Sequence, residues 1–86
     1  MIYTYVLKSL KDNHWYTGIT NDLKKRIVEH NAGKVDSTRN RRPFRLIYCE
    51  MCLNEQDAKI REKYLKTAWG KRYIKNRLKH YLTGWR

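Results

Sequence analysis

Five side chains in this sequence form a set that could act on a phosphate ester. Two are phenols, Tyr5 and Tyr16, and the others are Arg26, His30 and Glu62. An arginine offers a planar, permanently charged fork to phosphate oxygens, and a histidine changes charge near neutral pH. A carboxylate can hold a divalent cation. Hydrolysis of a phosphodiester bond needs groups of these kinds, provided that the fold brings them together.

The two tyrosines lie on two predicted strands. Residues 2–8 and 15–19 are rich in β-branched and aromatic side chains and flank a polar turn, which predicts a β-hairpin. If the hairpin loop has an even number of residues, the numbers of two paired residues add to an odd sum. Odd-numbered residues of the first strand then share a face with even-numbered residues of the second. Tyr5 and Tyr16 should therefore share one face of the hairpin. An aromatic pair that only stabilises the sheet is the alternative interpretation.

Arg26 and His30 lie on a predicted helix that directly follows the hairpin. Asn21 or Asp22 can cap its N-terminus, the helix should run to about residue 30, and Gly33 should end that region. Residues four apart share a helix face, so Arg26 and His30 should lie side by side. A surface cation and a histidine that interacts with the helix dipole are the alternative.

Glu62 lies on the apolar stripe of a second predicted helix, over residues 55–69. Asn54 should cap this helix and Gly70 should end it. A carboxylate on such a stripe is costly unless it is paired or binds a cation. It could pair with Arg61 or a neighbouring lysine, or it could serve a metal or a substrate. The members of the stripe that we expect to face the core are Ala58, Leu65 and Trp69.

The remaining pattern completes an α/β (α+β) fold in the order β-β-α-β-α-α. Residues 34–45 should form a long exposed loop, residues 46–52 a third strand and residues 71–82 a third helix. The simplest assembly is a small three-stranded antiparallel sheet packed by helices. A chain of 86 residues fits one domain, over 1–82, with a short tail at 83–86. Cys49 and Cys52 are best interpreted as reduced strand cysteines, since a single CxxC is weak support for a metal.

The charge balance indicates a polyanionic partner. Lys and Arg number 20 against 8 Asp and Glu, a net charge of +12. Nucleic acid is the commonest such partner, with an acidic membrane surface or structural RNA as rivals. The sequence contains no apolar run near the ~20 residues of a membrane span and no signal-peptide pattern at its start. A cytoplasmic location without a membrane partner is the resulting expectation.

The order and spacing of these residues resemble the GIY-YIG endonuclease family, in its small stand-alone branch. Its two signatures appear in altered form as residues 3–5, YTY, and 16–18, YTG. The helix NDLKKRIVEHN follows, and AKIREKYLK at residues 58–66 matches the helix that carries the family's metal ligand. The resemblance covers about residues 1–82. Tyr3 and Thr4 replace the first Gly and Ile, and Thr17 replaces the second Ile.

The resemblance implies a metal-dependent endonuclease that hydrolyses DNA by in-line attack of water. The resemblance implies that Tyr5 is the general base and that His30 relays the proton of Tyr5. Tyr16 would orient water or phosphate, Arg26 would bind the phosphate, and Glu62 would hold Mg²⁺, with Mn²⁺ as a substitute. Low sequence specificity is expected. The enzyme would act on branched or single-stranded DNA, in a role of the repair or recombination type.

DNA contacts are expected outside this catalytic set. The loop arginines and nearby lysines would grip backbone phosphates, which positions DNA without reading its sequence. The chain would work as a monomer or as a transient dimer on DNA, and Trp85 in the tail could stack on a base or pack on the domain. A non-catalytic nucleic-acid-binding module is the alternative function, and Glu62 discriminates against it. The residues predicted to contact nucleic acid are Gly18, Lys24, Lys25, Lys34, Arg39, Arg41, Arg42, Arg45 and Asn76.

Overall fold

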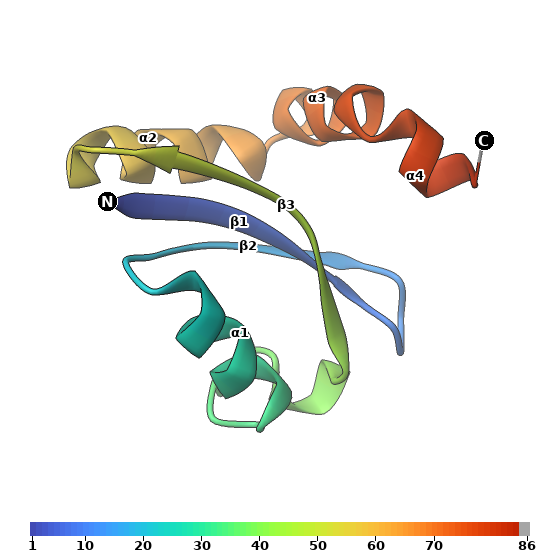
Figure 1. The fold of residues 1–86 in the computed structure, drawn as a ribbon. Coiled ribbons are helices and arrows are strands. Elements are labelled where there is room, and N and C mark those ends of the chain that lie inside the picture. The colour runs from blue at the N-terminus through green and yellow to red at the C-terminus, as the bar shows by residue number, and fades with distance from the viewer. Residues whose placement is uncertain (85–86) are drawn as a thin grey trace.

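The computed structural model describes residues 1–84, and its helices lie on both sides of a three-stranded sheet (Figure 1). The predicted tail residue Trp85 lies outside this range. A 3₁₀ turn, Arg39–Arg41, precedes the third strand. The other elements are β1 (Ile2–Ser9), β2 (Trp15–Thr20), α1 (Leu23–Asn31), β3 (Phe44–Cys52), α2 (Glu55–Leu65), α3 (Ala68–Arg77) and α4 (Lys79–Thr83).

The sheet confirms the predicted antiparallel architecture. Its strand order is β2-β1-β3, so β1 lies in the centre and pairs with both neighbours. In the hairpin, Tyr5 pairs with Gly18 and Leu7 with Tyr16, so that paired numbers add to 23. This sum is odd, as predicted for a hairpin with an even-length loop. Tyr5 and Tyr16 are therefore diagonal neighbours on one face of the sheet.

Each face of the sheet buries its own apolar cluster. Tyr5 and Leu7 pack with Phe44 on the face that α1 covers. On the opposite face Val6 packs with Leu65 of α2 and Ile74 of α3. Figure 1 shows α1 on one side of the strands and α2, α3 and α4 on the other. Because side chains alternate along β1, the central strand presents two different surfaces, one to each helical layer.

Side-chain caps fix where the first two helices begin. Asp22 accepts a hydrogen bond from the backbone N–H of Lys25 at 3.1 Å. Asn54 accepts from the N–H groups of Gln56 and Asp57 at 2.8 and 3.2 Å. Both contacts satisfy backbone donors that lack partners in the first turn. The predicted cap of α2 is confirmed, and of the two candidates for α1 the cap is Asp22.

The end of α2 corrects the prediction that one helix continues to Gly70. The helix ends at Leu65, Thr67 caps α3 by accepting from the N–H of Gly70, and Gly70 lies inside α3. A Cβ on Gly70 would lie 2.2 Å from the carbonyl oxygen of Tyr64. This glycine therefore allows α3 to pack tightly against the end of α2, and does not break a helix.

Two further expectations for this region are wrong. Trp69 was expected in the core, but its side chain is 67% exposed and lies under the guanidinium of Arg72. The early break rotates this residue out of the α2 stripe. The helix predicted over residues 71–82 is divided into α3 and α4, which meet at Leu78. In the described range 1–84, no helix has the length and apolar character needed to span a membrane.

The segment over residues 34–45 is not simply an exposed loop. Val35 and Thr38 are buried, and the segment includes the 3₁₀ turn. The side-chain amide of Asn31 pairs with the backbone of Phe44, accepting from its N–H at 2.7 Å and donating to its carbonyl at 3.1 Å. This pair ties the end of α1 to the start of β3, which begins two residues earlier than predicted.

Candidate active site

The two phenols and the histidine predicted as catalytic meet on the face of the sheet that α1 covers. The ring centroids of Tyr5 and Tyr16 are 6.4 Å apart, and that of His30 lies 5.8 Å from Tyr5 and 5.0 Å from Tyr16. His30 is fully buried although it lies in the last turn of α1. The helix thus places His30 against the sheet, although it also lies in the last turn of α1, as the helix-dipole alternative supposed.

Gly18 makes room for the Tyr5 side chain. A Cβ at this position would lie 2.6 Å from the Tyr5 hydroxyl oxygen and 2.8 Å from the ring carbon that bears it. Tyr5 and Gly18 are directly paired across the hairpin, so the phenol extends over its partner residue. Gly18, predicted to contact nucleic acid, is thus closely approached by the Tyr5 hydroxyl.

A chain of hydrogen bonds runs from Tyr5 through His30 to Thr38. The Tyr5 hydroxyl lies 2.9 Å from Nε2 of His30, and Nδ1 of His30 lies 2.8 Å from Oγ1 of Thr38. Thr38 donates its own proton to the carbonyl of Val35 at 3.4 Å. In the tautomer with the proton on Nδ1, Oγ1 of Thr38 accepts from Nδ1–H and Nε2 accepts the Tyr5 proton.

Thr38 is a site residue that the sequence did not single out. It is buried beneath His30 and follows it by eight residues, inside the segment predicted as exposed. Its neighbours along the chain are polar and carry no helix or strand period that would mark a buried position. Only the fold of residues 34–41 beneath α1 reveals its contact with the histidine.

Burial keeps both members of the Tyr5–His30 pair neutral. Burial raises the pKa of Tyr5, and the nearby Arg26 guanidinium opposes this rise without cancelling it. Burial, assisted by the charge of Arg26, lowers the pKa of His30 below its ordinary value of 6.5. At neutral pH a phenol therefore donates to a neutral imidazole, which is the state from which His30 can accept a proton.

Arg26 lies at the open side of this cluster. It forms an ion pair with Glu29 at 3.2 Å, and its side chain is 36% exposed. Interaction with the Tyr5 hydroxyl is the main cause that raises the pKa of Arg26. The guanidinium is thus close to the phenol while it retains solvent contact, a position from which it could meet a phosphate.

Glu62 lies on α2, on the other side of the sheet from α1 (Figure 1). Its negative charge is the smallest of the causes that act on the pKa of Tyr5, so the carboxylate influences this phenol only weakly. Lys66, one turn later, forms an ion pair with it at 3.4 Å, whereas Arg61 pairs with Glu50 at 2.7 Å. The predicted lysine pairing is confirmed and the Arg61 alternative is wrong.

Glu62 is the one carboxylate in the predicted catalytic set. Within residues 1–84 there is no cluster of three or more His, Cys, Asp or Glu side chains placed to bind a metal. Mg²⁺ commonly uses one or two carboxylates and completes its shell with water and substrate phosphate. The Glu62 side chain is 21% exposed, so its carboxylate remains accessible for this role.

Two of the arginines predicted to contact nucleic acid form ion pairs within the domain. Arg41 forms an ion pair with Asp12 at 2.9 Å, which lowers the pKa of Asp12 to about 2, and Arg39 pairs with Asp36. These two guanidiniums also hold the loop in place. Asn76 lies on α3, on the opposite side of the sheet from α1 (Figure 1). The exposed cations around α1 and the loop are Lys24, Lys25, Lys34, Arg39, Arg42 and Arg45.

Comparisons with known proteins agree with this architecture. The family model described as the GIY-YIG catalytic domain matches residues 1–79. The UPF0213 protein CPE1444 of Clostridium perfringens is 48% identical over 67 residues, which cover 77% of this chain and 71% of that protein. The UPF0213 protein YazA of Bacillus subtilis is 48% identical over 63 residues, 72% of this chain and 63% of YazA. Both similarities include most of the domain.

A solved structure supports the fold independently. The solution NMR structure of the UPF0213 protein BH0048 from Bacillus halodurans superposes with a TM-score of 0.52 at 36% sequence identity. The superposition covers 86% of this chain and 82% of that one. The resemblance inferred from the signature residues is thereby confirmed. The chain belongs to the GIY-YIG catalytic-domain family, among the stand-alone UPF0213 proteins.

Proposed function

We propose that this protein is a metal-dependent endonuclease that hydrolyses DNA phosphodiester bonds. The observation that carries the proposal is the buried hydrogen-bonded chain Tyr5–His30–Thr38, with the Arg26 guanidinium close to the Tyr5 hydroxyl. If Tyr5 and Tyr16 only stabilised the sheet, no histidine would need to be hydrogen-bonded to the Tyr5 hydroxyl. A non-catalytic nucleic-acid-binding module needs no carboxylate next to a phosphate site. The arrangement instead matches a general base with its proton acceptor, beside a phosphate-binding cation.

The hydrogen bonds suggest how the reacting water loses its proton. The water oxygen attacks phosphorus in line with the leaving oxygen, forming one P–O bond as the other breaks. Tyr5 accepts the proton of the water while its own proton passes to Nε2 of His30. Because the pKa of Tyr5 is raised, a preformed phenolate is disfavoured, and transfer through the pair avoids it. The leaving oxygen takes a proton from solvent.

The other residues bind and orient the phosphate. Arg26 donates hydrogen bonds to its non-bridging oxygens and offsets their growing charge. Tyr16, packed against His30, orients the water or the phosphate from the neighbouring strand. Mg²⁺ held by Glu62, with Mn²⁺ as a substitute, would supply positive charge at the scissile phosphate, consistent with the general use of divalent metals by GIY-YIG nucleases.

The positive charge of the surface supports DNA as the substrate. Because the contacts would be with phosphates, we expect little sequence specificity. The exposed lysines and arginines around α1 and the 34–45 segment would contact phosphates. Binding should weaken steeply with salt. We place the protein in the cytoplasm, acting on branched or single-stranded DNA in repair or recombination, as a monomer or as a transient dimer.

Replacement of Arg26 by Lys tests the proposed phosphate contact. Lysine keeps the positive charge but loses the two-pronged geometry, so we expect Mg²⁺-dependent cleavage to fall about 10²-fold. Single-stranded, duplex and flapped DNA would be offered in parallel, with chelator as the blank. Lys24→Arg, on the exposed side of the same helix, is the control and should cleave normally. Undiminished cleavage by the Arg26 variant would remove this residue from the mechanism.

Replacement of Thr38 by Val tests its role as the positioning residue for His30. Valine has a similar shape but cannot accept the Nδ1 proton, so the imidazole loses the contact that fixes its tautomer. We expect cleavage to fall about tenfold to a hundredfold at neutral pH, and Thr38→Ser to restore it. In the wild type, cleavage should persist through pH 6.5 and decline only at lower pH, because burial lowers the pKa of His30 below its ordinary value and His30 must be neutral to accept a proton. An unchanged rate and pH profile in Thr38→Val would contradict this role.

A further inference from the structure

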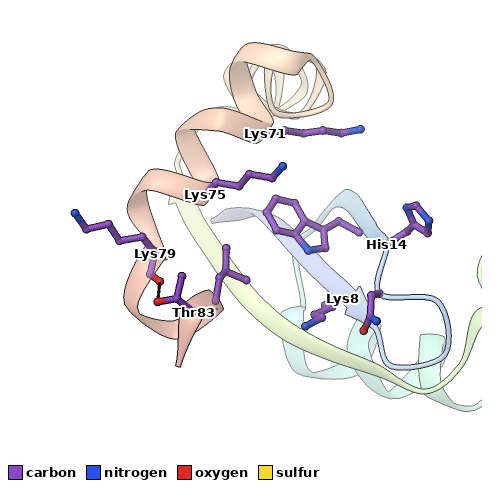
Figure 2. Close-up of a pocket in the computed structure, with 9 residues that line it drawn as sticks. Lys8, His14, Lys71, Lys75, Lys79 and Thr83 are labelled. Atoms are coloured by element: carbon purple, nitrogen blue, oxygen red, sulfur yellow. Dashed lines mark hydrogen bonds between the residues drawn. The ribbon is translucent and has the colours of Figure 1, made fainter. Parts of the chain in front are cut away.

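A basic groove lies on the face of the sheet opposite to the Tyr5–His30 cluster. It has a volume of about 580 Å³ and lies between the β1–β2 hairpin and the helices α3 and α4. Figure 2 shows Lys71 and Lys75 reaching from α3 toward the hairpin that carries Lys8 and His14, while Lys79 extends away from it. The side chains that define this lysine groove are Lys8, His14, Trp15, Lys71, Lys75 and Lys79.

The charges of the lysine groove are not neutralised by the protein. No acidic residue lines it, and none of its four lysines takes part in an ion pair within residues 1–84. By contrast, Arg26, Arg39, Arg41 and Arg61 each have a carboxylate partner. Like charges gathered in one concavity repel each other and raise the local concentration of anionic ligands.

The spacing of the lysines suits a chain of negative charges. Lys71 and Lys75 are four residues apart on α3, so they follow each other along one helix face at about 6 Å. Trp15 is half-buried in the groove and lies opposite Lys8 in the hairpin register. An aromatic surface between cations is how proteins hold unpaired nucleotides, with bases on the ring and phosphates on the lysines.

A second, smaller cavity connects the lysine groove with the edge of the active site. It has a volume of about 240 Å³ and shares Trp15 and Lys71 with the groove. Tyr16 and Lys66 also line it, and Lys66 is the ion-pair partner of Glu62. The concave surface thus continues from Tyr16 and Lys66 to Lys71.

We propose that the lysine groove binds a single nucleic-acid strand that continues from the cleavage site around the β2 edge of the sheet. This inference rests on the proposed nuclease function. The strand must pass from one face of the sheet to the other within the width of this small domain. Duplex DNA is too stiff for such a turn, because its persistence length is about 150 base pairs. A flexible unpaired strand can follow the path.

Metal-free binding measurements test the groove separately from cleavage. Fluorescence anisotropy would compare the wild type with Lys71→Gln/Lys75→Gln, using labelled oligo-dT of about 4 and about 16 nucleotides. Arg72→Gln/Arg77→Gln is the control, since it removes the same charge from the same helix. For the long strand at about 0.1 M salt, we expect the lysine double variant to bind about tenfold more weakly, with a log–log salt slope smaller by about 1.4. The control and the short strand should change by about threefold or less.

Other outcomes of the same experiment would overturn the proposal. Equal weakening in both double variants would show that only the total charge matters. Equal weakening for the short strand or for a duplex of the same length would contradict the path around β2. Displacement of the long strand by polyglutamate as effectively as by unlabelled oligo-dT would indicate an acidic protein as the partner. Because no metal is present, absence of cleavage elsewhere would overturn the nuclease proposal without altering these results.

Discussion

Replacement of Tyr5 by Phe is expected to reduce Mg²⁺-dependent DNA cleavage about 10²- to 10⁴-fold while DNA binding persists. The change removes one hydroxyl and leaves the ring that fills the space above Gly18. That hydroxyl lies 2.9 Å from Nε2 of His30 and is the group assigned to deprotonate water. Initial rates on labelled DNA and anisotropy without metal would measure the two quantities separately.

Tyr3→Phe provides a matched control for this prediction. Tyr3 lies two residues earlier on the same face of β1, and within residues 1–84 its hydroxyl forms no hydrogen bond. The same chemical change there should leave cleavage within about threefold of the wild type. Cleavage by Tyr5→Phe at the rate of Tyr3→Phe would show that another group is the general base. Equal loss in both variants would point to a general effect on the strand.

Replacement of Gly70 by Ala is expected to destabilise the fold, although alanine is the better helix former. In an open helix the change would add about 1 kcal/mol of stability. Here the new Cβ would lie 2.2 Å from the carbonyl oxygen of Tyr64 and 2.4 Å from Cα of Leu65. These are backbone atoms, so α3 must move away from α2. We expect a loss of about 1–3 kcal/mol or more in the free energy of unfolding.

Thermal unfolding would measure this loss. For a domain of this size each 1 kcal/mol corresponds to a fall in Tm of about 4–8 °C. Gly84→Ala is the comparison, because its Cβ would meet nothing within 4 Å and only the positive φ of 70° opposes the change. A higher Tm for Gly70→Ala would mean that α2 and α3 do not approach each other as closely as the structure has them.

The parts of the site that the sequence predicted depend on local periodicity. The odd pairing sum of the hairpin placed Tyr5 and Tyr16 on one face, and the four-residue spacing placed Arg26 beside His30 on α1. The residues from Asn54 to Leu65 retain a helical period after a recognisable cap, so Glu62 was placed on the inner side of α2. Repeats of two and 3.6 residues are properties of single elements, which a sequence displays directly.

The features of the structure that the sequence did not predict depend on contacts between segments that are distant along the chain. Thr38 acquires its partner only because residues 34–41 fold back beneath His30. Gly70 was interpreted as a helix breaker, since glycine has low helix propensity, but its position is set by the close approach of two helices. The lysine groove combines β1, β2, α3 and α4. No local pattern in any one of these elements indicates that they line one cavity.

The most direct test of the central claim compares Mg²⁺-dependent cleavage by the wild type and by Glu62→Gln. The substitution keeps the size of the side chain but removes the charge that a cation needs. We predict that the wild type cuts DNA only with a divalent metal, and that Glu62→Gln loses about 10²-fold or more of this activity. Salt-sensitive DNA binding should persist in both. Absence of cleavage by both proteins, or equal cleavage by both, would contradict the account.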